Sequence, residues 1–258
     1  SSDRGCSVGY CTQWTGDDWS VQHNFQKAKS EWNDIPEEPN KEQARILREE
    51  FFDKLNKDQL RDALIKEQHG LCVYCMSRIE NTAESTVIEH WYPLSKSKEK
   101  ALQYENLFAS CYGGQKETVK GVHRICCCDA KKHDASIKVD PRNERMMENI
   151  VYYSDGRIDF SESYATAKIR NTLRGDLWYH LGLNGSVKND GAMLADTTTE
   201  LVKKRKDAYE AAEDMLMVLD EDNELSPERV EEIIADMQAQ DIWDEYIGVT
   251  MFVLRQGI

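Results

Sequence analysis

Four short stretches between residues 72 and 134 decide how this chain is expected to fold: CVYC at 72–75, VIEHWYP at 87–93, NLFASC at 106–111 and CDAKKHD at 128–134. The first spaces two cysteines so that one tight turn can offer both thiolates to a single metal ion. In the second, the β-branched and apolar run at 86–88 predicts a short strand. That strand should end at Glu89 and His90, because Pro93 prevents further pairing.

The cysteines are clustered rather than spread along the chain. Six of the eight lie between residues 72 and 128, which favours a structural zinc site over a disulfide scaffold. The expected ligands are Cys72, Cys75, Cys111 and Cys128. Cys126 and Cys127 remain alternatives for the fourth ligand, and Cys128 is preferred because it directly precedes an acidic helix start. A redox-active CxxC pair is the other interpretation, but it needs a thioredoxin-like strand and helix around it.

The 258-residue chain carries a net charge of −14, which opposes nucleic-acid binding except through a local patch. The charge is uneven: residues 201–240 hold five basic and twelve acidic residues (−7), and residues 111–138 hold six basic and three acidic ones (+3). The candidate phosphate contacts in this second segment are Lys116, Lys120, Arg124, Lys131 and Lys132. The acidic segment is either a partner surface or a solvated helix face.

The start of the chain carries no export signal, and no apolar run approaches the ~20 residues that cross a bilayer. We therefore expect a cytoplasmic, reduced protein without membrane contact. Cys6 and Cys11 stand apart from the cluster and are expected to be free thiols without a shared role.

Glu89, His90, Asp129 and His133 form the candidate catalytic group. A carboxylate such as Glu89 is a hard ligand for Mg²⁺ or Mn²⁺, and a neutral histidine such as His90 can take a proton from an attacking water. Asp129 and His133 are four residues apart on an expected helix over 129–135, so both could hold the same ion. Adjacent strand residues point to opposite faces, and a twist or bulge beside Pro93 is needed to bring Glu89 and His90 into one cleft.

The order of these stretches resembles the HNH nucleases, whose core is two strands and a helix around one divalent ion, often braced by a four-cysteine zinc site. The resemblance implies that His90 is the general base and that Glu89, Asp129 and His133 are ligands of a catalytic Mg²⁺ or Mn²⁺. It also implies that Asn106 orients the loop that carries the base.

Longer phrases narrow the resemblance. EQHGLCVYC at 67–75, IEHWYPLSK at 88–96, NLFASCYGG at 106–114, CDAKK at 128–132 and LGLN at 181–184 are similar to the PtuB family, the HNH nuclease subunits of Septu-type and retron-associated bacterial antiphage systems. The similarity runs from about residue 55 to 210. It implies a metal-dependent endonuclease acting on DNA or RNA beside a PtuA-like ATPase. In retron-associated systems, a reverse transcriptase with its RNA–DNA hybrid is a further implied partner.

The expected fold is therefore α+β, mostly helical, with a small ββα-metal core of the HNH type braced by four cysteines. Three regions are expected: a partly irregular and helical start at 1–55, the zinc-braced core at 56–140, and a hairpin with helices at 141–258. The expected elements are helices at 25–32, 41–54, 57–69, 164–173, 199–219 and 227–238, and a hairpin at 150–160 that turns at Asp155-Gly156. The alternatives are a zinc-braced nucleic-acid-binding module without catalysis and an adaptor whose acidic helices bind a partner.

Overall fold

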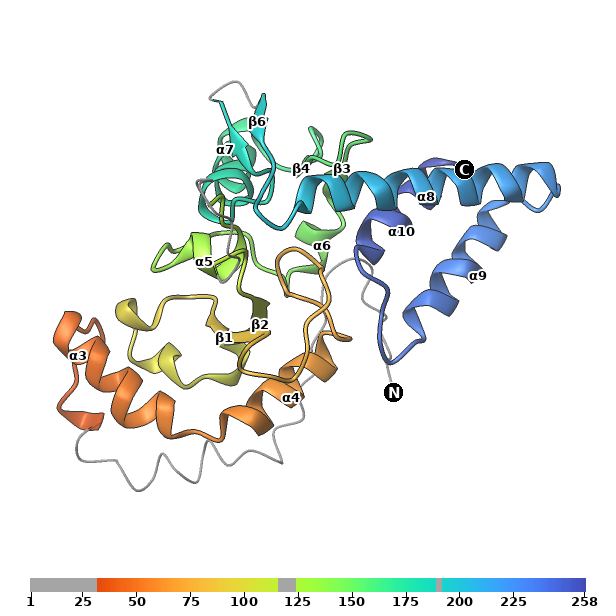
Figure 1. Cartoon of the computed structure of the whole chain (residues 1–258). Coiled ribbons are helices and arrows are strands. Elements are labelled where there is room, and N and C mark those ends of the chain that lie inside the picture. The colour runs from red at the N-terminus through yellow and green to blue at the C-terminus, as the bar shows by residue number, and fades with distance from the viewer. Residues whose placement is uncertain (1–31, 116–123, 189–191) are drawn as a thin grey trace.

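The computed structural model describes residues 32–115, 124–188 and 192–258 (Figure 1). Cys6, Cys11, Lys116 and Lys120 lie outside the described residues, as does nearly all of the predicted helix at 25–32. Within the described part the chain is α+β, as expected, with many helices and three small antiparallel sheets of two strands each.

The first half of the described chain carries the elements around the cysteines. Its longer helices and strands are α3 (Lys41–Ile46), α4 (Lys57–Glu67), β1 (Thr86–His90), β2 (Leu107–Cys111) and α5 (Cys128–Lys132). A π-helical turn (Leu47–Phe51) and a 3₁₀ turn (Phe52–Lys54) continue α3, and further 3₁₀ turns cover Leu94–Lys96, Glu99–Ala101 and Tyr104–Asn106.

The second half is mostly helical. Its elements are α6 (Glu144–Met147), β3 (Ile150–Tyr152), β4 (Ile158–Phe160), α7 (Ala167–Gly175) with a π-helical end (Asp176–His180), β5 (Ser186–Val187), β6 (Met193–Ala195), α8 (Leu201–Glu221), α9 (Pro227–Gln238) and α10 (Ile247–Gln256).

Helix α4 begins at Lys57, as the sequence predicts, and ends at Glu67, two residues before the predicted end. The Asn56 side chain accepts a hydrogen bond from the backbone N–H of Gln59 (3.2 Å), which satisfies one of the unpaired donors of the first turn. The helix ends before Gly70, whose φ of 79° is readily adopted only by glycine. Beyond the helix, the buried Gln68 amide donates to the carbonyl of Ala109 (2.8 Å) and accepts from its N–H (2.7 Å). This side chain thereby fixes the end of α4 to the edge of β2.

The β1–β2 hairpin is the centre of the first half (Figure 1). Its register is continuous, from Thr86 opposite Cys111 to His90 opposite Leu107. Helix α4 contacts both strands, and α5 contacts β2. Leu107, Phe108 and Ala109 are buried, so β2 is covered on both faces, as its continuous apolar sequence requires.

In the second half, the β3–β4 hairpin turns at Asp155-Gly156 as predicted, and α9 begins at Pro227 with Ser226 as its N-cap. Arg205 of α8 is fully buried and donates to the carbonyls of Gly156 and Leu183. Its guanidinium therefore ties α8 to the hairpin and to the LGLN segment. Among the described residues, no helix is both long and apolar enough to cross a membrane.

Candidate metal centre and carboxylate cluster

Four thiols converge at the junction of the hairpin, the CVYC turn and α5. The sulfur atoms of Cys72, Cys75, Cys111 and Cys128 all lie within 4.8 Å of one another. Among the residues that the structure describes, this is the only group of three or more His, Cys, Asp or Glu side chains close enough to share one ion. The expected ligand set is thus brought together, with Cys128 in the fourth place.

Backbone hydrogen bonds build the cluster from three separate segments. The CVYC turn closes when the Met76 N–H donates to the Cys72 carbonyl (3.0 Å), and the Val73 N–H joins it to β2 at Ala109 (3.1 Å). Cys111 is the last residue of β2. Cys128 is the first residue of α5, and its N–H donates to the carbonyl of Leu181 (2.8 Å). The LGLN segment therefore positions the fourth thiol.

Hydrogen-bond donors surround the Cys72 thiol, whereas contacts among the cysteines raise the pKa values of the Cys75, Cys111 and Cys128 thiols well above their usual range. The Cys111 N–H donates to the Cys72 sulfur (3.3 Å), and the Ser77 hydroxyl lies 3.0 Å from the Cys75 sulfur. Although burial acts to raise it, the pKa of the Cys72 thiol lies well below its usual range because neighbouring thiols and an N–H hydrogen-bond to it. Four clustered sulfur donors are the set that structural zinc prefers, so these residues fit a zinc ion.

The two remaining cysteines of the CCC triplet lie beside the four-thiol group. The Cys127 sulfur is buried, 3.7 Å from that of Cys128. Its N–H donates to the carbonyl of Gly113 (3.0 Å), which holds the strand end against the helix start. A Cβ on Gly113 would lie 1.9 Å from the Cys127 carbonyl oxygen, so this close approach requires glycine. Cys126 is half-buried.

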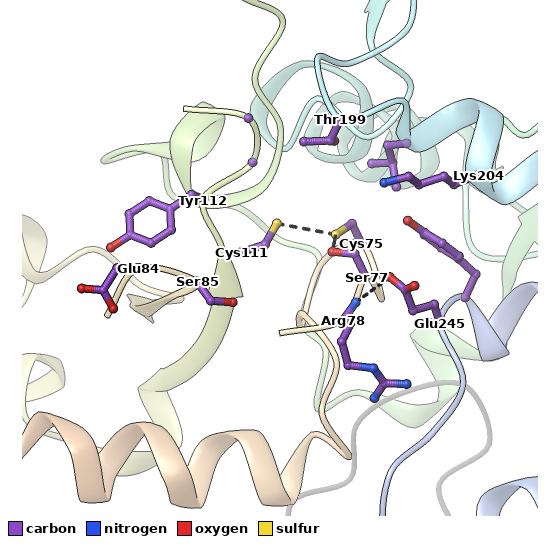
Figure 2. A pocket seen from close by; sticks show the side chains of 14 residues that line it. Cys75, Ser77, Arg78, Glu84, Ser85, Cys111, Tyr112, Thr199, Lys204 and Glu245 are labelled. Carbon is purple, nitrogen blue, oxygen red and sulfur yellow. Dashed lines mark hydrogen bonds between the residues drawn. The ribbon is translucent and has the colours of Figure 1, made fainter. Parts of the chain in front are cut away.

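A pocket of about 310 Å³ opens beside the thiols (Figure 2). Cys75 and Cys111 lie in its wall, with the side chains of Arg78 and Lys204 across from Glu84. Glu245 also faces this space and accepts a hydrogen bond from the Arg78 N–H (2.8 Å). The charged side chains balance one another, which does not favour a phosphate here, but the pocket gives solvent a route to two of the four sulfurs.

A second polar cluster surrounds Glu89 on the hairpin. Its carboxylate accepts from the Tyr74 hydroxyl (3.1 Å) and forms an ion pair with the Lys132 ammonium (2.6 Å). The Lys132 and Glu89 side chains are only 0% and 6% exposed. Burial, followed by a hydrogen bond with the Asp129 carboxyl, raises the pKa of Glu89 well above its usual range, and Lys132 opposes the shift. Two carboxyl groups from a strand end and a helix start therefore meet beside one ammonium.

The structure does not bring His90 into this cluster, contrary to the sequence prediction. The expected bulge is absent, because the pairing is regular as far as His90, so Glu89 and His90 project to opposite faces. The His90 ring is 6% exposed, packs on Phe52 with ring centroids 4.5 Å apart, and its Nε2 lies 2.9 Å from the Ala101 carbonyl. Burial lowers the pKa of His90 to about 3, far below the range in which a general base works best near neutral pH.

Asn106 holds the loop that follows the strand. Its buried side chain accepts from the Tyr92 N–H (2.8 Å) and donates to the carbonyls of Tyr92 and Lys100 (both 2.9 Å). These bonds close the loop between β1 and β2.

Two further predicted site residues are placed differently from the expectation. Helix α5 ends at Lys132, and His133 follows with a φ of 46° and an exposed side chain. Because His133 has left the helix, the predicted helical pairing of Asp129 with His133 is not formed. Lys132 was expected to contact phosphate, but its ammonium forms an ion pair with Glu89 and donates a hydrogen bond to the His90 carbonyl (2.9 Å). Lys131 and Arg124 are exposed.

Sequence reasoning missed Tyr74 and the LGLN segment as parts of the site. Tyr74 lies inside the CVYC phrase, between two ligands, and its polar end is the only sign that it would hydrogen-bond a carboxylate. Gly182 has a φ of 61°, and a Cβ there would lie 2.8 Å from the Cys126 carbonyl oxygen. A glycine next to leucines was the available sign of this close approach.

In comparisons with known proteins, no family model and no curated protein matches this chain.

Proposed function

We propose that this chain is a metal-dependent endonuclease of the HNH type that hydrolyses nucleic-acid phosphodiester bonds. The observation that carries the proposal is the buried Glu89 carboxyl at the end of β1, which is held by Tyr74 and Lys132 beside α5, whose first turn carries Asp129. Hard oxygen ligands of this kind suit Mg²⁺ or Mn²⁺. A divalent ion held there would neutralise charge on a scissile phosphate.

The residues around this pair have separate roles in the proposal. Lys132 neutralises part of the carboxylate charge, Tyr74 orients one Glu89 oxygen, and Asn106 fixes the loop that follows the strand. Proton abstraction from water by His90 would require its ring to leave Phe52 and lose its contact with the Ala101 carbonyl. The four-thiol cluster is assigned a structural zinc ion that braces the strand end against the helix.

A second candidate is a zinc-braced nucleic-acid-binding or adaptor subunit without catalysis. Two observations favour it: His90 is packed as a core residue, and the Lys132 ammonium already forms an ion pair with Glu89. In this candidate the carboxylate cluster is a buried structural network.

Cleavage of a panel of single- and double-stranded DNA and RNA, with Mg²⁺ or Mn²⁺, separates the two candidates. For the nuclease, Glu89→Gln and Asp129→Asn should each lower the cleavage rate by more than about tenfold, because each loses a metal ligand. The matched control is Asp134→Asn, an exposed acid just beyond the same helix. Zinc content and circular dichroism should be unchanged in all three variants.

Cleavage that survives both carboxylate substitutions contradicts the proposed site. Binding without cleavage of any substrate, by a zinc-loaded protein, supports the second candidate. His90→Ala, compared with His180→Ala at an exposed position, then shows whether His90 takes part in the reaction.

The PtuB-like phrases support a further step: we propose that this nuclease acts in a bacterial antiphage complex with a PtuA-like ATPase. A retron reverse transcriptase with its RNA–DNA hybrid is a further component in the retron-associated form. Co-expression should yield a complex with the ATPase, and Glu89→Gln should abolish protection against phage while leaving the complex intact. Loss of the complex in this variant would point to a folding defect instead.

A further inference from the structure

The distal half of α8 carries an apolar stripe that stays exposed among the described residues. Ala211, Met215 and Val218 recur at i, i+4 and i+7, and therefore lie along one side of the helix. Met215 is 38% exposed and Val218 is 56% exposed. A different side of α8 is buried, including Ala212 and Leu219, and α10 packs on this helix. We call the exposed side, residues 211, 215 and 218, the α8 stripe.

Acidic residues surround the stripe. Residues 207–228 contain nine Asp or Glu and no Lys or Arg. Nearer the start of the helix, Lys203 and Lys206 form ion pairs with Asp207 and Glu210, so the charge imbalance grows toward the end of α8. Asp214 and Glu221 fall on the side of α8 next to the stripe and are exposed.

This combination restricts what can bind. Such an acidic surface would repel a phosphate backbone, so the segment 207–228 does not suit a nucleic acid. An exposed i, i+4, i+7 pattern is the geometry by which one helix packs against another. Acidic side chains on its border select a partner whose own border is basic.

We infer that the α8 stripe is a docking surface for an amphipathic, Lys/Arg-rich helix of a partner protein. The apolar side chains supply the buried contact, and the acidic border sets the orientation and speeds the encounter. This surface is separate from Glu89 and the thiol cluster, and the inference does not depend on nuclease activity.

The test uses a fluorescent synthetic peptide of about 18 residues, long enough to form a helix, with Leu at i, i+4, i+7 and i+11 and Lys at the exposed positions. A scrambled peptide of the same composition has equal charge but no apolar side. Fluorescence anisotropy with the full chain should show binding of the patterned peptide at least about tenfold tighter than of the scrambled one. Raising the salt concentration should weaken binding of both peptides.

Val218→Glu should weaken binding of the patterned peptide by about tenfold or more, since it puts a charge inside the contact. Asp214→Lys together with Glu221→Lys should weaken it and flatten its salt dependence. The matched control is Ile169→Glu on α7, which changes an apolar residue of similar exposure (49%) on another helix. Circular dichroism checks each variant, and Val218→Ser replaces Val218→Glu if that variant unfolds.

Equal binding of the two peptides, or a Kd unaffected by Val218→Glu and Val218→Ser, overturns the inference. Light scattering gives a second check. If the chain is a dimer that Val218→Glu converts to a monomer, the stripe is covered by a second copy of the chain, and the inference is also overturned.

Discussion

Replacing Lys132 by methionine isolates the energetics of the carboxylate cluster. The substitution keeps the length of the side chain and removes the ammonium that lies 2.6 Å from Glu89 and 2.9 Å from the His90 carbonyl. Both partners are almost fully buried, so solvent cannot replace the lost cation. Breaking a buried ion pair in this way costs about 3–5 kcal/mol of folding stability.

Protonation of Glu89 limits that loss. Burial and the neighbouring Asp129 carboxyl already raise the pKa of Glu89 above its usual range, and Lys132 is the cation that opposes this shift. Without Lys132 the pKa of Glu89 should rise further, so that Glu89 holds a proton instead of lying charged beside Asp129. We therefore expect Lys132→Met to lower the free energy of unfolding by about 3 kcal/mol at pH 7. The loss should be smaller at about pH 5.5, because protonation of Glu89 then costs less.

Urea unfolding at both pH values, followed by circular dichroism in zinc-containing buffer, measures these differences. Lys131→Met is the matched control. The Lys131 side chain is next to Lys132 in the sequence but exposed, so its replacement should change the free energy of unfolding by less than about 0.5 kcal/mol. Adding Mg²⁺ or Mn²⁺ should recover part of the loss if Glu89 and Asp129 bind a divalent ion. A loss below about 1 kcal/mol, or an equal loss at the two pH values, would refute the assigned Lys132–Glu89 pair.

Three further outcomes are expected. Cys128→Ser should lose the roughly one zinc ion per chain expected for a four-thiolate site and melt at a lower temperature, whereas Cys126→Ser should keep it; equal zinc content by mass spectrometry would contradict the ligand assignment. The pKa of His90 is about 3 in the folded chain and 6.5 ordinarily, so the unfolded chain binds a proton more readily than the folded chain. The free energy of unfolding should therefore fall as the pH drops from 6.5 toward 3, by about 2 kcal/mol at about pH 5. His90→Gln should lack this share of the pH dependence of urea unfolding, and a slope equal to that of the parent chain would show that the ring is not buried. Asn106→Ala should cost about 2–3 kcal/mol, because buried backbone groups of Tyr92 and Lys100 lose their partner; hydrogen exchange that stays unchanged in the 91–100 loop would argue against this anchor.

Local chemistry made much of the fold predictable. Asn56 and the Ser226-Pro227 pair mark helix starts through backbone donors that need capping, and Asp155-Gly156 marks a tight turn. The cysteine spacing predicted the four-thiol cluster because four thiols that bind one zinc ion must lie close together in the fold, however far apart they are in the sequence. The position of Cys128 rather than Cys127 at the cluster also follows the prediction.

Other features depend on contacts that the sequence does not reveal. Helix α10 was not predicted because its sequence, IGVTMFVL at 247–254, is apolar on nearly all sides and buried, so it lacks the polar alternation that identifies a surface helix. Helix α5 was expected to continue past His133, but that residue adopts a positive φ instead. The burial of Lys132 was missed because its partner Glu89 lies on a strand 43 residues earlier.

One backbone hydrogen bond beyond the end of β1 helps to fix the face of the β1–β2 hairpin on which the His90 side chain lies. The Trp91 N–H donates to the carbonyl of Asn106 (2.9 Å), so the ladder continues past His90 and leaves no room for a bulge. A slip of one residue would exchange the two faces and turn His90 toward Asp129. Asn106 thus supports this register through its backbone carbonyl and anchors the loop through its side chain, while Phe52 and the Ala101 carbonyl hold the His90 ring on the opposite face from Glu89. If His90 is the general base of the proposed nuclease, Asn106→Ala should change the cleavage rate, because it loosens the loop that follows His90. If Glu89 and Asp129 act without His90, His90→Gln should leave the cleavage rate unchanged.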